Sequence, residues 1–274
     1  MSTVRPAQRG LLFLGCLLAF VRWEPAPYDL FLSIIFLVYT WALPWKPYQL
    51  VFVVLLGPLL FTHVPALGAA LEVAPERTLY YSLVTLYLAL SSVFFMSLPE
   101  RSVPLLLLGY EVGALLSGLL GVLAFLRIPG LEDLLWGGSR AVAFFKDPNV
   151  FGAFLIPALF LALARLEQGR KFWILPALIL FLGVLVSLSR GAWANFAVAL
   201  LAWWLLRPRK RIWLPLVLLT LAGGVGISVV VMPDNPIVQR LGFMPYDKER
   251  FFTQMEALSL ALTQPLGYGP GLSE

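Results

Sequence analysis

Charged residues are scarce in this chain of 274 residues: 13% are Asp, Glu, Lys or Arg, whereas 60% are hydrophobic. A water-soluble domain usually carries about a quarter charged residues, because its surface faces water. Here the charges are too few to cover a surface but sufficient to mark loops between buried segments. The composition excludes an ordinary soluble domain and indicates a protein whose main solvent is lipid.

Cysteine and histidine are nearly absent, since the chain has only Cys16 and His63. A single cysteine excludes an intrachain disulfide, and one cysteine with one histidine cannot build a zinc site of the usual Cys/His kind. We therefore expect no metal and no cofactor. The net charge is +5, but the densest basic cluster, 207–211, lies between two apolar runs rather than on a solvated face. Nucleic acid is thus not an expected partner.

Apolar runs bounded by charges and prolines predict an all-α, polytopic transmembrane bundle over residues 1–232. A membrane helix needs roughly 20 apolar residues, and shorter runs are tolerated when flanking side chains snorkel. The first run also fits a signal peptide, but residues 21–24 are bulky and charged and offer no cleavage site, which favours a span. The predicted spans lie near 10–21, 28–43, 48–64, 78–98, 103–126, 149–166, 172–189, 192–206 and 212–232.

Lysine and arginine are distributed unevenly between the two sides of these spans. With a cytoplasmic N-terminus, the inner segments hold eleven basic residues against two acids, and the outer segments nine against twelve. Short loops alone give eleven basic residues inside and six outside, and the positive-inside rule counts these loops. We predict a multi-pass protein of the cell inner (plasma) membrane. The eleven inner residues are Arg5, Arg9, Lys46, Arg101, Arg165, Arg170, Lys171, Arg207, Arg209, Lys210 and Arg211.

The predicted outer side carries two long segments, the loop 127–148 and the tail 233–274. Within the tail, residues 247–263 have the apolar periodicity of an amphipathic helix, which Pro265 and the glycines of 267–271 end. Such a helix either lies along the outer membrane surface or packs over the bundle.

Two motifs lie where a predicted outward-facing helix begins. The first motif is Lys146-Asp147-Pro148-Asn149, with an aspartate suited to the N-cap and a proline at the first helical position. Starting a helix is by itself a sufficient explanation of this motif. The turn Ser187-Leu188-Ser189-Arg190 leaves its arginine at membrane level, where it either snorkels to headgroups or forms a fixed cation. Helix N-termini also attract anions.

Further cations are predicted on the same side, at Lys248 and Arg250 in the tail. If Lys146, Arg190 and Arg250 converge, they form an electropositive pocket at lipid depth. Because arginine contacts phosphate oxygens through two parallel N–H groups, such a pocket suits a lipid-linked diphosphate. We interpret two other polar residues as structural. Glu111 should face the bundle interior with a partner, and His63 fits a packed or interfacial side chain better than a catalytic one.

These motifs resemble those of the O-antigen ligase and O-antigen polymerase membrane proteins. The resemblance rests on Phe145-Lys146-Asp147-Pro148-Asn149-Val150-Phe151-Gly152, on Ser187-Leu188-Ser189-Arg190-Gly191-Ala192, and on Arg250 followed by Pro265-Leu266-Gly267-Tyr268-Gly269-Pro270-Gly271. It covers the chain from about residue 140 onward, whereas the first half matches only as hydrophobic spans.

The resemblance implies a membrane glycosyltransferase that takes a glycan from undecaprenyl diphosphate and joins it to a lipid A-core type or glycan acceptor. It implies that Arg190 and Arg250 bind the donor diphosphate, with Lys146, Asp147, Asn149 and Ser189 in support. Relatives also carry a catalytic histidine on a large periplasmic loop, but no histidine follows His63 in this chain. We therefore identify no catalytic residue, and two explanations stay open: the chain is incomplete, or the catalytic step is carried out differently.

Two other classes of protein stay open. A transporter or flippase of a lipid-linked or anionic solute would place ionisable residues near the bilayer midplane and show duplicated halves, and we find no duplicated halves. A non-catalytic membrane subunit of polysaccharide assembly would need no histidine.

Overall fold

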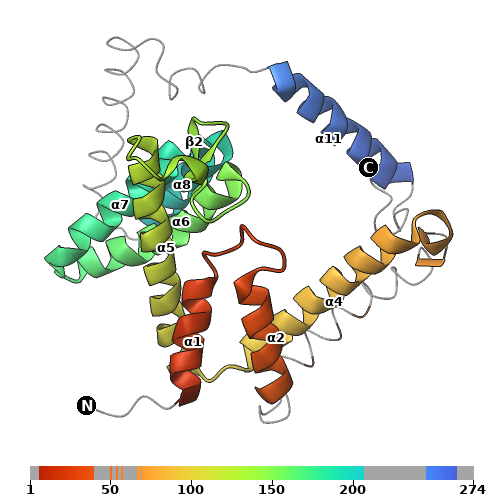
Figure 1. Cartoon of the computed structure of the whole chain (residues 1–274), viewed down its shortest axis with the longest axis horizontal. Helices are drawn as coiled ribbons and strands as arrows, with labels where there is room; N and C mark the ends of the chain where they lie inside the picture. The colour runs from red at the N-terminus through yellow and green to blue at the C-terminus, as the bar shows by residue number, and fades with distance from the viewer. Residues whose placement is uncertain are drawn as a thin grey trace. The chain divides into compact units, whose positions relative to one another are not determined.

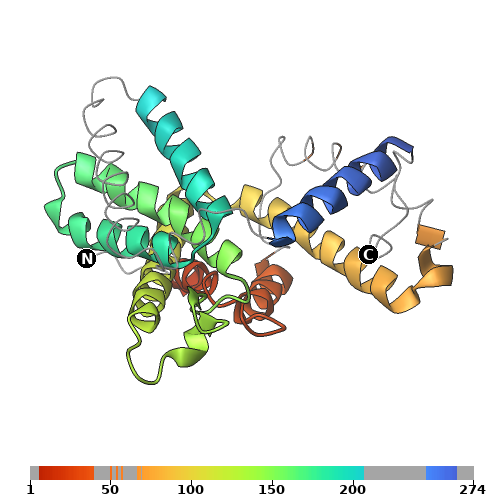
Figure 2. The same ribbon diagram turned by 90° about the horizontal axis from the view of Figure 1, so that it is seen from above.

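The computed structural model describes residues 6–39, 70–206 and 245–263, together with residues 50, 54, 57, 67 and 68 (Figures 1 and 2). The chain divides into two compact units, which are described separately. The first unit comprises Met1–Leu30 and Arg101–Phe243, and the second comprises Phe31–Glu100 and Met244–Glu274.

The first unit is built around one central helix, α5 (Val103–Phe125), which packs against α1 (Pro6–Leu17) on one side and against α6 and α7 on the other. Helix α6 (Pro148–Glu167) is followed by the short helix η3 (Lys171–Trp173), by α7 (Ile174–Val186) and by α8 (Arg190–Leu206). Figure 1 shows α6 and α7 crossing α5 at a steep angle.

Glycines allow α1 and α5 to pack backbone against backbone. A Cβ atom at Gly113 would lie 2.6 Å from the carbonyl oxygen of Cys16, and one at Gly109 would overlap the carbonyl oxygen of Leu12. Small residues spaced four apart are the usual way for membrane helices to approach closely. Because residue numbers rise together along the contact, the two helices run in the same direction.

Substituting Gly15 tests this close contact within α1 itself. A Cβ at Gly15 would overlap the backbone of Leu106 and lie 2.8 Å from the backbone nitrogen of Tyr110, whereas nothing lies within 4 Å of one at Gly10. We expect Gly15→Ala to lower the free energy of unfolding by about 1–3 kcal/mol, because the backbones must separate. Gly10→Ala should be neutral or slightly stabilising, since alanine favours helix. Equal thermal stability of the two purified variants would contradict the packing described here.

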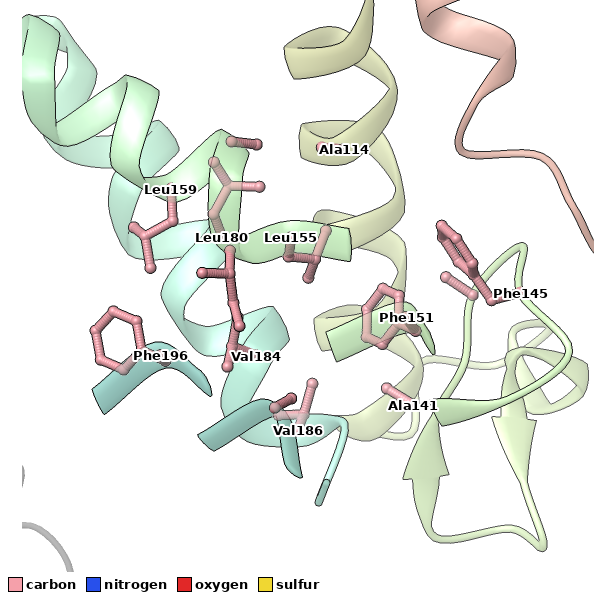
Figure 3. Packing of buried hydrophobic residues seen from close by; sticks show 14 of the residues in the cluster. Ala114, Ala141, Phe145, Phe151, Leu155, Leu159, Leu180, Val184, Val186 and Phe196 are labelled. Atoms are coloured by element: carbon pink, nitrogen blue, oxygen red, sulfur yellow. The ribbon is translucent and has the colours of Figure 1, made fainter. Parts of the chain in front are cut away.

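Apolar side chains fill the space between α5, α6, α7 and α8 (Figure 3). Phe151 and Leu155 of α6 are fully buried, and Leu180 and Val184 of α7 are nearly so. Gly121 lets α5 come close, because a Cβ at this position would meet the ring of Phe151. This core fixes the N-terminal half of α6 and the C-terminal half of α7, on which the candidate site is built.

The second unit contains two long helices with little burial among the described residues. In α4 (Pro75–Ser97) only Thr78, Phe94 and Ser97 are buried, and the hydroxyl of Thr78 donates to the carbonyl oxygen of Ala70 over 3.0 Å. Helix α11 (Pro245–Thr263) exposes every side chain from Lys248 to Thr263. Helix α2 (Pro27–Tyr39) runs from the first unit into the second.

The helical, membrane-type character predicted from the sequence is confirmed in the described residues. Three helices there are long and apolar enough to cross a membrane, Pro75–Ser97, Glu100–Phe125 and Pro148–Glu167, and the apolar segment Lys171–Val186 is shorter. Seven predicted spans correspond to described helices, whereas most of 48–64 and all of 212–232 lie outside the described residues. The number of spans and their orientation stay predictions.

The helices of the structure do not match the predicted spans residue by residue. The first helix ends at Leu17 rather than at residue 21, because the next residues form a turn and the N–H of Val21 donates instead to the carbonyl of Phe144. The loop 127–148 contains a two-stranded antiparallel hairpin, β1 (Leu135–Trp136) and β2 (Arg140–Ala141).

Candidate functional site

The segment between α5 and α6 contains the hairpin, which packs against α5, α6 and α7. The hairpin turns at Gly137 and Gly138, which have φ of 56° and 67°, and the N–H of Ser139 donates to the carbonyl of Trp136. Two successive positive φ angles are what a tight hairpin turn requires, and glycine adopts them at low cost. One face of the hairpin is buried through Leu135 and Ala141, so its position on the helices is fixed.

The start of α6 is capped as the sequence predicts. The Oδ1 atom of Asp147 accepts a hydrogen bond from the N–H of Asn149 over 2.5 Å, and Pro148 is the first helical residue. A carboxylate in this position satisfies one free N–H and opposes the positive end of the helix dipole. Asp147 is therefore engaged in forming the helix terminus.

The turn before α8 is buried and held by its own hydroxyl groups. Ser187 and Ser189 are 0% and 1% exposed. The Oγ of Ser187 donates to the carbonyl of Val184 over 2.7 Å, and the Oγ of Ser189 accepts from the N–H of Ala192 over 3.2 Å. Leu188 has a positive φ of 50°, which is uncommon for a leucine. Ser189 is thus the N-cap of α8, and Arg190 is its first residue.

These two helix starts lie beside each other. A Cβ at Gly152, in the first turns of α6, would be 2.5 Å from the Oγ of Ser187 and 2.8 Å from the Cβ of Ala192. We call this region the α6/α8 junction, meaning residues 147–152, residues 187–192 and Arg140. The structure thus brings together Asp147, Asn149, Ser189 and Arg190, which the sequence predicted as parts of one site.

Arg140 of the hairpin joins the two halves of the junction. Its Nη2 atom donates to Oδ1 of Asn149 and its Nε atom to the carbonyl of Ser187, both over 3.1 Å. Sequence reasoning missed this residue. The Gly-Gly pair before it is a hairpin signal, but no local pattern tells which carbonyl a loop arginine reaches 47 residues away.

Removing this guanidinium should loosen the junction. Hydrogen bonds that involve a charged group contribute about 1.5–3 kcal/mol, and Arg140→Ala removes two of them. We expect faster hydrogen exchange in peptides that cover residues 147–152 and 187–193, measured by mass spectrometry on the full chain. Arg170→Ala, at an exposed position beyond the other end of α6, is the control and should leave these peptides unchanged. Unchanged exchange in Arg140→Ala would show that the junction does not depend on it.

Lys146, which the sequence predicted to support diphosphate binding, has a partner in a different loop. Lys146 forms an ion pair with Glu24, in the loop after α1, and Arg22 of the same loop donates to the carbonyl of Asp133 over 2.6 Å. Phe20 stacks on Phe144 with ring centroids 4.5 Å apart. These contacts fix the segment that leads into α6. Nearby, backbone N–H groups of Glu132 itself and of Gly130 hold the pKa of the Glu132 carboxyl below its ordinary value.

The two predicted diphosphate ligands lie in different units. Arg190 is partly buried at the start of α8, within the junction. Arg250 is exposed in α11, in the second unit, together with Lys248. The predicted convergence of Arg250 with Arg190 stays a prediction.

The polar pair predicted inside the helices is confirmed at the other end of α6. Glu111 of α5 is 4% exposed, and its Oε2 lies 2.5 Å from Nη2 of Arg165. The guanidinium stacks over the ring of Trp173, 4.1 Å from its centroid. Both carboxylate oxygens, Nη1 of Arg165 and Nε1 of Trp173 have no aligned hydrogen-bond partner among the described residues.

The comparisons with known proteins give no family. Neither the protein-family models, nor the curated proteins, nor the solved structures contain a match to this chain. In the part of the chain that the structure describes, no three His, Cys, Asp or Glu side chains are grouped as metal ligands would be.

Proposed function

We propose that this chain is a membrane glycosyltransferase of the O-antigen ligase or polymerase kind, which acts on an undecaprenyl-diphosphate-linked glycan at the outer face of the inner membrane. The proposal includes the nine predicted spans and the cytoplasmic N-terminus. Arg190 and Arg250 bind the diphosphate of the donor, and the acceptor is a glycan or a lipid A-core type molecule.

The observation that carries the proposal is the α6/α8 junction. Two helix N-termini lie side by side there, and two guanidinium groups, those of Arg140 and Arg190, belong to it. Helix N-termini and guanidinium groups both favour anions, and a diphosphate offers several charged oxygens for them to contact. Asp147 and Ser189 contribute by ordering the two helix starts rather than by binding the substrate.

The chemistry of glycan transfer needs such a site. When the acceptor attacks the first sugar, the bond to the donor phosphate breaks and negative charge accumulates on the departing diphosphate. Cations that are already positioned around that group stabilise the transition state more than the ground state. A site that binds the diphosphate therefore accelerates transfer even where the group that activates the acceptor is supplied elsewhere.

The buried Glu111–Arg165 pair favours one competing function, a transporter or flippase. Ionisable residues inside membrane helices often mark a path for solutes or protons. The two functions differ in whether a bond of the donor is broken, so the same preparation can distinguish them.

The test uses the full chain in proteoliposomes that contain an undecaprenyl-diphosphate-linked glycan and an acceptor. The proposal predicts release of free undecaprenyl diphosphate together with a lengthened or newly glycosylated acceptor. Movement of the intact donor across the bilayer without release of undecaprenyl diphosphate would support the transporter instead. In cells, deletion of the gene should change the length or attachment of a surface glycan, and unchanged surface glycans under conditions of expression would contradict the enzyme.

A further inference from the structure

The hairpin that carries Arg140 also carries an exposed tryptophan directly opposite it. Trp136 and Arg140 are partners in the antiparallel register, as are Leu135 and Ala141. Directly opposite residues of such a pair have Cβ atoms about 4.5–5.5 Å apart and side chains on the same face. Leu135 and Ala141 form the buried face, so Trp136 and Arg140 share the other one.

The side chain of Trp136 is 55% exposed, although most apolar residues of this segment are turned inward. Leu135, Ala141, Val142, Ala143 and Phe145 are all buried. The largest aromatic ring of this segment, in contrast, stays accessible. A ring that is exposed beside a folded, charged junction has the geometry of a stacking surface.

We propose that Trp136 is a stacking platform for the first sugar of the lipid-linked donor, which makes the hairpin the glycan-proximal subsite of the diphosphate site. This inference rests on the proposed function. The link to the junction runs through Arg140, which reaches both Asn149 and the carbonyl of Ser187, three residues before Arg190. A diphosphate held at the junction has its first sugar bonded directly to the terminal phosphate, so that sugar must lie beside the phosphate ligands.

The chemistry of an indole ring fits a sugar better than it fits an anion. The apolar C–H face of a pyranose packs flat on an aromatic ring, while the sugar hydroxyls stay at the edge, where polar groups can reach them. A tryptophan offers the largest such surface with few rotatable bonds to order on binding. Arginine beside tryptophan therefore forms a pair suited to a ligand that joins a phosphate to a sugar.

The competing role for Trp136 is that of an anchor at the membrane interface, where tryptophan is common. The chain offers a matched control for this role in Trp23, which is 53% exposed in the loop after α1, with its ring centroid 6.4 Å from that of Phe144. An anchoring role predicts similar effects of Trp136→Ala and Trp23→Ala, whereas the subsite predicts an effect on sugar recognition from Trp136→Ala alone.

The experiment measures equilibrium binding of two lipids to the full chain in nanodiscs, undecaprenyl diphosphate and undecaprenyl diphosphate that carries one hexosamine. We expect the wild type to bind the sugar-bearing lipid about tenfold more tightly, which corresponds to about 1.4 kcal/mol. Trp136→Ala should abolish this difference and leave the affinity for undecaprenyl diphosphate unchanged. Trp136→Phe should keep most of the difference, and Trp23→Ala should keep all of it.

Each other outcome is informative. Equal affinity of the wild type for the two lipids, or an equal loss for both lipids in Trp136→Ala, would overturn the subsite while leaving the diphosphate site intact. Loss of the sugar preference in Trp23→Ala as well would assign both tryptophans to the membrane interface. Failure of the wild type to bind either lipid would overturn the proposed function and the subsite with it.

Discussion

Arg165→Ala is expected to lower the free energy of unfolding by about 3–5 kcal/mol, because it leaves the carboxylate of Glu111 buried without a counter-charge. Glu111 is 4% exposed, and Arg165 is the charged partner of its carboxylate among the described residues. The substitution also removes the group that stacks on Trp173 and joins α6 to the following turn. Unfolding of the purified full chain in detergent, followed by heating or by added denaturant, measures the loss.

The second half of this prediction is a rescue. Replacing both partners of a buried ion pair with apolar residues of similar size is often neutral or stabilising, since neither charge is then left without compensation. The pair Glu111→Leu and Arg165→Leu together should therefore be closer in stability to the wild type than Arg165→Ala is. Arg170→Ala removes an exposed arginine five residues further along and should have no effect. A loss of stability in the double variant equal to the sum of the losses in Glu111→Leu alone and Arg165→Leu alone would show that the two charges do not depend on each other.

Arg190→Ala is expected to lower the rate of glycan transfer by about 10²–10³-fold, the usual loss when one pre-positioned group that stabilises developing charge is removed. Arg190 is the first residue of α8, and the hydrogen bonds of Ser187 and Ser189 fix the turn before it. The loss should appear mainly in the rate at saturating donor, because the charge on the diphosphate increases as the sugar leaves. Surface-glycan length in a complemented deletion strain, and release of undecaprenyl diphosphate in proteoliposomes, both measure it.

Lysine in place of the arginine separates charge from geometry. Arg190→Lys keeps the positive charge but not the two parallel N–H groups, so it should stay far below the wild type if the contact is bidentate. Arg250→Ala should resemble Arg190→Ala if both arginines bind the same diphosphate, and Arg170→Ala should retain full activity. Normal transfer in both alanine variants would contradict the assignment of these residues.

Much of the helical architecture could be predicted because its causes are local. Apolar runs, prolines at helix starts and an N-cap aspartate predicted α5, α6 and α11 to within a few residues. That Glu111 has a partner could be predicted, since a carboxylate in a membrane helix requires one. That this partner is Arg165 could not be predicted. Arg165 is 54 residues away in the sequence, and only the packing of α5 against α6 brings the two together.

The candidate site shows the same limit. Capping chemistry placed Asp147 at a helix start, and in the structure both Asp147 and Ser189 act as caps. That the two starts are adjacent depends on Gly152, whose missing side chain lets Ser187 and Ala192 approach, and on the fold of the hairpin. Neither the close approach at Gly152 nor the fold of the hairpin follows from a periodic pattern of residues, so the sequence alone could not predict them. Lys146 was grouped with the arginines because of its charge, whereas its actual partner, Glu24, belongs to a loop 122 residues away.

The most direct test of the account is equilibrium binding of undecaprenyl diphosphate and undecaprenyl phosphate to the full chain, in the wild type and in Arg190→Ala. If the α6/α8 junction binds a diphosphate, the wild type should prefer the diphosphate lipid by at least about tenfold, and Arg190→Ala should lose that preference while still binding the polyprenyl chain weakly. Equal affinity of the wild type for the two lipids, or an unchanged preference in Arg190→Ala, would contradict the central claim.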